Sequence, residues 1–192
     1  MEALFLRRGD NDMSATNKTR FDVQKIIRAA ILKAFNDLSL SGWSCIEFAN
    51  TAMQNANKVV MMNLTRIMRV GWQSGKDLMD NGVFKHQERW MECQYWQFHI
   101  ILKRDSSTTD SSILAEDVAN NLIGWFNGWG LEYLRNKGLS INWIDNSSVL
   151  VYNDNSDLYQ KRVVIPIEFN VPKMLVANQI EAELGEAETY PI

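Results

Sequence analysis

The chain has 192 residues, of which 46% are hydrophobic and 22% are charged, so it has enough apolar material for one full core. Its formal net charge of −3 argues against a general attraction for nucleic acid. No apolar run approaches the ~20 residues of a membrane span, and the first residues lack the order of a secretion signal. We expect one domain that acts inside a cell and does not span a membrane.

The two ends of the sequence differ from its middle. Residues 1–20 show no sustained period, which predicts an N-terminal arm. No basic residue follows Lys173, and residues 175–192 form an acidic tail. Its glutamates are Glu181, Glu183, Glu186 and Glu188. We expect the folded domain to occupy residues 21–174.

The first predicted helix begins at Asp22, which is a plausible N-cap. The sequence Ser-Leu-Ser-Gly at 39–42 ends it. Apolar residues recur between these points at helical spacing and predict one buried stripe. They are Val23, Ile26, Ile27, Ala30, Ile31, Ala34, Phe35 and Leu38.

Two extended segments follow at 45–53 and 58–71, separated by the polar residues 54–57, and this arrangement predicts a hairpin. In the second segment a single apolar face, interrupted by Arg66, is predicted from the alternation. Its members are Val60, Met62, Leu64, Met68 and Val70.

Between residues 72 and 87 the alternation lapses, which predicts a long loop or an extended hairpin. Its few apolar residues would be exposed on an isolated chain, so we predict that they contact another subunit or another partner protein. The alternative is that the segment folds back on its own domain. The predicted contact residues are Trp72, Leu78, Met79, Val83 and Phe84, with Trp72 and Phe84 as anchors.

Residues 89–103 and 159–171 alternate as strands with one packed and one polar face. Residues 139–144 and 149–152 predict a further strand, broken by a turn at 145–148. The packed faces consist of Trp96, Phe98, Ile100 and Leu102 in the first strand, and of Val163, Ile165, Ile167, Phe169 and Val171 in the last.

The second predicted helix has Asp110 or Ser111 as its cap and bends at the glycines 128–130 before ending at Gly138. Its apolar positions are Ala115, Val118, Leu122, Trp125, Phe126 and Trp129. The predicted fold class is therefore α+β, an antiparallel β-sheet flanked by two main helices.

Few residues are candidates for catalysis or for binding a metal or cofactor. His86 and His99 lack metal-ligand spacing, and Cys93 lies ~20 Å along a strand from His99, too far for a nucleophile and its base. Glu116 and Asp117 suit a helix start, and Cys45 and Cys93 suit reduced packing residues. We expect no catalytic, cofactor-binding or metal-binding residue and no enzyme. The aromatic cluster Trp125, Phe126 and Trp129 fits a core, and the alternative is a small-ligand pocket.

Four segments together show a family resemblance. They are Val-Val-Met-Met-Asn-Leu-Thr-Arg-Ile-Met-Arg-Val-Gly at 59–71, Tyr-Trp-Gln-Phe-His-Ile-Ile-Leu-Lys at 95–103, the helical residues 115–122 with 133–139, and the strand 159–171. In this order they resemble the tail-terminator and neck-terminator proteins of tailed bacteriophages, over about residues 22–174.

The resemblance implies a structural virion protein, assembled in the host cytoplasm, that forms a ring, usually a hexamer, at the neck or top of the tail. Its implied partners are further copies of itself, the tail tube or sheath protein, and the head-neck connector protein. Genomic DNA would pass through the lumen without tight binding. The alternative is another head-tail connector or tail-completion subunit.

Overall fold

The computed structural model describes residues 18–47, 57–80, 83–103, 114–145, 148–153 and 159–178. The fold is α+β, as predicted, with a mixed sheet and three helices. The predicted caps Asp110 and Ser111, the acidic tail beyond residue 178 and most of the N-terminal arm lie outside the described residues. The elements are α1 Arg20–Asp37, β1 Ser44–Glu47, β2 Lys58–Asp80, β3 Val83–Lys103, α2 Ala115–Asn127, α3 Trp129–Asn136, β4 Ser140–Ile144, β5 Ser148–Asn153 and β6 Tyr159–Asn178.

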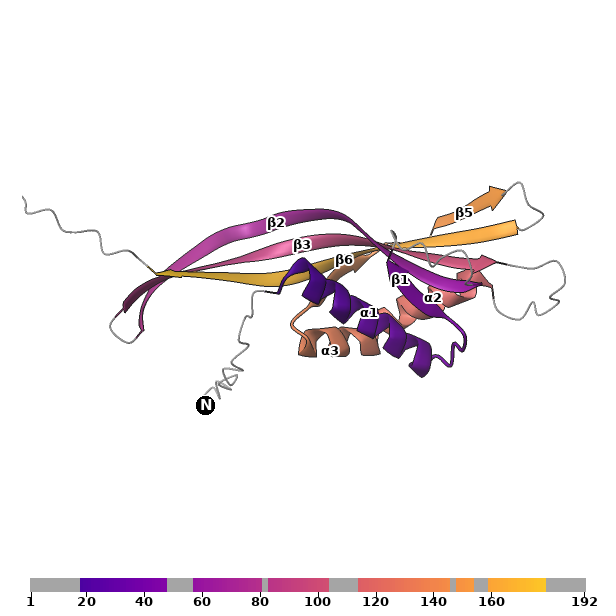
Figure 1. Ribbon diagram of the computed structural model, residues 1–192, viewed down its shortest axis with the longest axis horizontal. Coiled ribbons are helices and arrows are strands. Elements are labelled where there is room, and N and C mark those ends of the chain that lie inside the picture. Colours follow the sequence, from indigo (N-terminus) through magenta and orange to yellow (C-terminus); the bar gives the residue numbers. More distant parts are fainter. Residues whose placement is uncertain are drawn as a thin grey trace, which may run out of the picture.

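The sheet has the strand order β1-β2-β3-β6-β4, and β5 also pairs with β6 (Figure 1). Because β3 pairs with β6 from residue 160 to 178, both β4 and β5 must lie along the other edge of β6. They form the predicted strand with a break. Pro166 lies at the break, where its carbonyl accepts a hydrogen bond from the Asp145 amide at 3.0 Å but its nitrogen has no proton to donate.

The three helices pack on one face of the sheet, at one end of it (Figure 1). We call this side the helix face and the opposite side the far face. The alternating apolar residues of β3 and β6 fill the helix face, as predicted, and Phe98 lies 5.7 Å from Phe126 and 6.3 Å from Phe169 between ring centroids. The core therefore lies between the helices and the middle of the sheet.

The helix termini differ from the predictions in detail. Thr19 rather than Asp22 is the N-cap of α1, and the Asp22 carboxylate accepts hydrogen bonds from the Thr19 amide at 2.9 Å and hydroxyl at 2.6 Å. The predicted bend at the glycines is a break, since Gly128 separates α2 from α3. Gly138, with φ +71°, follows the end of α3 as predicted.

One of the two predicted strand pairings is wrong. β1 pairs with β2 in parallel, Ser44 opposite Val59, so the two segments are no hairpin; alternation identifies a strand but not its direction. Of the two alternatives for residues 72–87, the extended hairpin is confirmed, because β2 and β3 pair antiparallel out to Asp80 opposite Val83. Here the strands lie beyond the helices, and without a buried face they lack the alternation that identifies a strand in sequence.

Candidate interaction surface

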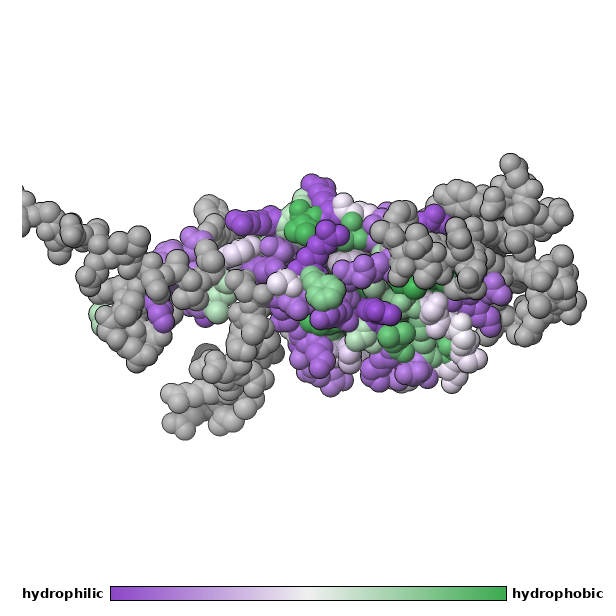
Figure 2. All heavy atoms as spheres, in the orientation of Figure 1, coloured by the Kyte–Doolittle hydropathy of each residue, from purple (hydrophilic) through white to green (hydrophobic). Residues whose placement is uncertain are grey.

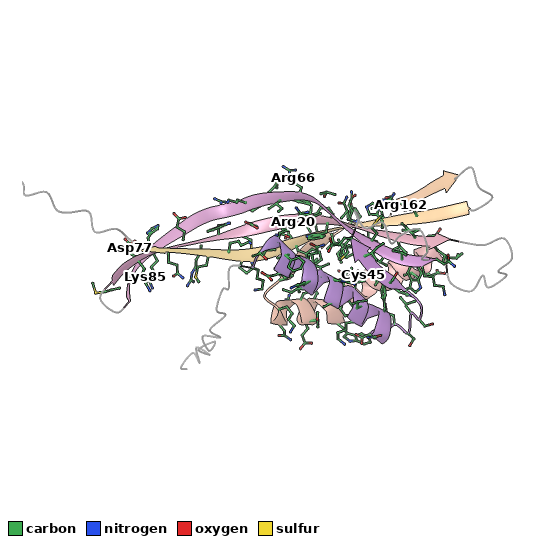
Figure 3. All side chains as sticks on the ribbon, in the orientation of Figure 1. Arg20, Cys45, Arg66, Asp77, Lys85 and Arg162 are labelled. Carbon is green, nitrogen blue, oxygen red and sulfur yellow. The ribbon has the colours of Figure 1, made fainter. Side chains whose placement is uncertain are left out.

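Three strands continue beyond the helix layer as a projection, which comprises residues 70–80 of β2, 83–91 of β3 and 172–178 of β6 (Figure 1). At its outer end Lys85 pairs with Asn178, and Figure 3 shows Asp77 and Lys85 there, with Arg66 nearer the helices. None of the described core-cluster residues belongs to the projection. Local burial of apolar surface therefore does not explain why the chain builds it.

A β-bulge near the base of the projection changes which side chains of β2 face the helices. Leu64 pairs with Trp96 and Arg66 with Tyr95, so Thr65 is an extra residue. Because alternation restarts after it, Met68 and Val70 lie on the far face, whereas Leu64 packs against the core on the helix face. The prediction that one face holds all five residues is therefore correct for Val60, Met62 and Leu64 and wrong for Met68 and Val70.

The displaced residues create an apolar band on the far face. Val70 pairs with Met91 and Met91 pairs with Pro172, so one rung is apolar across all three strands. Val70 is 43% exposed and Met91 37%, and Figure 2 shows hydrophobic surface over the middle of β2. The band, named the far-face band from here on, consists of Met68, Val70, Met91, Pro172 and Met174.

Charge is also divided between the two faces of the projection. The register places Lys76 opposite Gln87, Lys85 opposite Leu78, and Arg89 opposite Ser74, all on the far face with Met91. Arg66 lies on the same face at the base. Asp77 and Glu88 lie instead on the helix face, and the register places the acidic Asp80 on the far face only at the outer end, opposite Val83. The far face thus combines apolar and basic residues.

On the helix face of the projection, the charged side chains pair with neighbours on the same face. The Asp77 carboxylate lies 2.7 Å from Nδ1 of His86, whose pKa is raised mainly by that hydrogen bond, and Glu88 lies 3.5 Å from Nε2. At the base, the guanidinium of Arg69 lies 4.8 Å from the centroid of the Trp90 ring. Lys173 donates to the Lys18 carbonyl and lies 3.6 Å from the Glu92 carboxylate.

The edges of the projection are poorly suited to adding a strand. Pro172 is six residues from Pro166 in an unbroken register, so its nitrogen faces the same outer edge of β6 and leaves that edge without a donor there. On the other side, β2 is irregular at Thr65 and between Val70 and Ser74. Bulges and prolines disfavour edge pairing, so the far face is the better candidate for contact with a partner.

The structure tests only part of the predicted contact. Met79 is 65% exposed and its backbone pairs with Phe84 near the end of the projection. The side chains of Trp72, Leu78, Val83 and Phe84 lie outside the described residues, although their backbones belong to β2 and β3. Exposure of Met79 agrees with a role in contact, and the contact itself stays a prediction.

The predicted aromatic cluster divides into two parts. Trp125 and Phe126 are buried in the core, and the indole of Trp125 donates to Asp37 at 2.9 Å. Trp129 is 69% exposed and stands between two surface hollows, of about 330 and 520 Å³. Asp37 and Glu132 line the larger hollow. Trp129 is therefore a second exposed apolar feature of this molecule.

Glu168, a buried carboxylate of β6, fixes β4 to the sheet. Glu168 is only 3% exposed and accepts a hydrogen bond from the Asn142 side chain at 2.7 Å and another from the Trp143 indole. Burial tends to raise its pKa, but hydrogen bonds from Asn142, Cys93, Tyr95 and Trp143 outweigh burial and lower it. A bulge at Asn142 turns both β4 side chains toward Glu168.

The predicted chemical candidates lie apart. Burial raises the pKa of the Cys45 thiol to about 12 and of the Cys93 thiol to about 11, so both stay protonated. His99 accepts a hydrogen bond from Arg162 at 2.8 Å, and burial lowers its pKa to about 4. The part of the chain that the structure describes contains no group of three acidic, His or Cys side chains suited to a metal ion.

None of the described helices is both long enough and apolar enough to cross a membrane. No protein-family model matches the chain, and no curated protein matches it. Among solved structures, similarity is found to a chain of the "Virion of native gene transfer agent (GTA) particle". The two are 11% identical with a TM-score of 0.31, covering 78% of this chain and 98% of that chain.

Proposed function

We propose that this chain is a structural virion protein of a tailed bacteriophage, which forms a ring that terminates the tail tube and joins it to the head-neck connector. The observation that carries the proposal is the projection. It extends beyond the core, exposes an apolar band and Met79, and so offers a surface that burial against another subunit would stabilise.

A ring subunit needs the properties that this fold combines. The rigid sheet in the body would position the projection, and a projection that reaches another copy makes a contact of the kind that closes rings. The resemblance to tail-terminator and neck-terminator proteins supplies the place in the particle and the hexamer as the expected stoichiometry. We propose no enzymatic role, and DNA would pass through the ring without tight binding.

The first test is the mass of the intact purified assembly at low micromolar concentration. The proposal predicts a closed multiple of the 22.1 kDa chain, with six copies expected. A chain that stays monomeric under these conditions would contradict the ring. Titration with duplex DNA near physiological salt should show little binding, and sub-micromolar affinity would contradict an inert lumen.

The second test shortens the projection. Arg69 and Glu92 are directly paired, so residues 70–91 can be replaced by Asn-Gly, which favours a two-residue hairpin turn. Circular dichroism and melting should change little because no described core-cluster residue is lost, while assembly should fail. A chain ending at Asn178 serves as the control for removing residues outside the projection. Unchanged assembly of the shortened chain would reject the predicted contact.

A further inference from the structure

The far-face band is bracketed by two arginines that lack an acidic partner in the described part of the chain. Arg66, at the base, lies 5.8 Å from the centroid of the Tyr95 ring, and Arg89, toward the outer end, donates to the Gln87 side chain at 3.4 Å. Arginine forms its strongest hydrogen bonds with carboxylates. The surface therefore fits a partner that presents an apolar side chain beside acidic groups.

The same chain presents such a group on its helix layer. Trp129 is exposed at the start of α3, and Asp37 and Glu132 line the hollow at its side. Lys33 lines the same hollow and pairs with Asp37 at 3.0 Å, so Glu132 is the acidic side chain of this hollow for which no ion pair is described. The Trp129 surface, defined by Trp129, Glu132 and the two adjacent hollows, is thus complementary in charge to the far face of the projection.

The two surfaces cannot meet within one chain, since the far-face band is on the side of the sheet opposite the helices. We propose that the far-face band packs on the Trp129 surface of a second copy of this chain. This inference rests on the proposed ring and names the surface that each projection contacts. Because each copy uses two different surfaces, the contact is head-to-tail and leads to a closed ring when the rotation between copies permits closure.

The chemistry of the two surfaces favours this occupant over nucleic acid. Trp129 can insert between methionine side chains, whose sulfur atoms make favourable contacts with aromatic rings. Tryptophan and arginine are the residues that most often dominate binding energy at protein interfaces. A phosphate backbone would pair with Arg66 and Arg89 but would leave the rung of Val70, Met91 and Pro172 without an apolar partner.

Site-directed crosslinking tests the contact directly. A copy with Met91→Cys and a differently tagged copy with Trp129→Cys are mixed, allowed to assemble and treated with a short bis-maleimide. The native thiols of Cys45 and Cys93 are buried and protonated, so the introduced cysteines should be the ones that react. The inference predicts a covalent dimer that carries both tags.

Two matched pairs control for random collision. Ile67→Cys replaces Met91→Cys with an exposed position on the helix face of the same strand pair, and Phe21→Cys replaces Trp129→Cys with an exposed aromatic position on α1. Neither control should give the mixed dimer at a comparable rate. Equal yields from control and test pairs would overturn the inference.

A charge exchange tests the polar part of the contact. Arg89→Glu or Glu132→Arg alone should weaken assembly about ten-fold, and the two together should restore most of it. Single variants that assemble normally, or a double variant as weak as the singles combined, would count against the pairing. If instead duplex DNA binds tightly and Arg89→Glu abolishes that binding, the face is a phosphate surface and the inference is wrong.

The outcomes separate this inference from the proposed function. An assembly of the expected mass without the crosslink between positions 91 and 129 overturns the docking surface and leaves the ring standing. A chain that stays monomeric overturns both. Loss of the crosslink in a chain ending at Asn178 would assign the contact to residues 179–192, which contain four glutamates, and would also overturn the inference.

Discussion

The body and the projection are made from the same three strands but are stabilised in different ways. In the body, β2, β3 and β6 present alternating apolar residues to three helices, and the largest fully buried side chains are Phe98, Phe126 and Phe169. In the projection the strands are held together by backbone pairing, and most of the described side chains are exposed or half-buried. The burial of apolar side chains that stabilises the fold therefore lies in the body, whereas the projection adds solvent-exposed surface.

The point of transition between the two regions is the bulge at Thr65. Its hydroxyl donates to the Tyr95 carbonyl at 3.0 Å, which holds the irregularity in place. Before it, the even-numbered residues of β2 enter the core, and after it they form the far-face band. One extra residue therefore converts a core pattern into an exposed surface.

The largest predicted effect removes an aromatic ring from the body. Phe98→Ala should destabilise the protein by about 3–5 kcal/mol, because the ring is fully buried between Phe126 and Phe169. Met91→Ala, in the projection, should cost about 0.5 kcal/mol or less. Chemical denaturation of both variants measures the difference. Equal losses would mean that the projection takes part in the core.

A pH-dependent loss of stability should also originate in the body. His99 has a pKa of about 4 in the folded chain because burial and then the Arg162 charge disfavour its protonation, whereas an unfolded histidine titrates near 6.5. Between these values the unfolded state binds the proton, so stability is full above about 6.5 and falls by about 3 kcal/mol as the pH drops to 4.

His99→Gln is the variant that isolates this contribution, since the carboxyl groups that titrate in the same range are unchanged. The difference in unfolding free energy between parent and variant should shrink as the pH falls from 6.5 to 4. His86→Gln, in the projection, should leave the acid loss of the parent intact. A pH-independent difference for His99→Gln would show that His99 is protonated as easily in the folded chain.

The edge of the body provides a smaller test. Glu168→Gln keeps the size of the side chain but replaces one accepting oxygen by a donating NH₂ group, which then faces the donors of Asn142 or Trp143. We expect a loss of about 1–3 kcal/mol. In an Asn142→Ala background the loss should be smaller, and a double-mutant cycle measures the coupling. Fully additive losses would mean that Glu168 does not fix β4 through Asn142.

These two regions also differ in how well sequence predicts them. The helix-face residues of β3 and β6 were predicted correctly, because one buried face imposes strict alternation. For residues 72–87 the prediction left a long loop and an extended hairpin open, because strands without a buried face carry no such pattern. Only the Asn-Gly pair at 81–82, a common hairpin turn, could have indicated two strands that meet there.

The far-face band could not be predicted from the sequence for a related reason. Alternation alone placed Met68 and Val70 with Val60, and nothing in the local sequence marks Thr65 as the extra residue. The burial of Glu168 could not be predicted either, because its hydrogen-bond partners come from β3 and β4, which lie far from it in sequence. Contacts between distant segments decide both features, whereas sequence periods report only local order.

The smallest predicted effect lies at the outer end of the projection. His86 pairs with Asp77 across β2 and β3, and the pKa of the imidazole is raised mainly by the hydrogen bond to that carboxylate. The sign is opposite to that of His99: the stabilisation is full below the unfolded value of about 6.5 and is lost as the pH rises through the raised pKa. Because both side chains are exposed, we expect little change in global stability. NMR titration of His86 should show a pKa above 6.5 that falls in the Asp77→Asn variant, while the pKa of His99 should not move. A His86 pKa that is unchanged in Asp77→Asn would show that the pair does not form and that the two strands are less firmly held at their outer end than in the body.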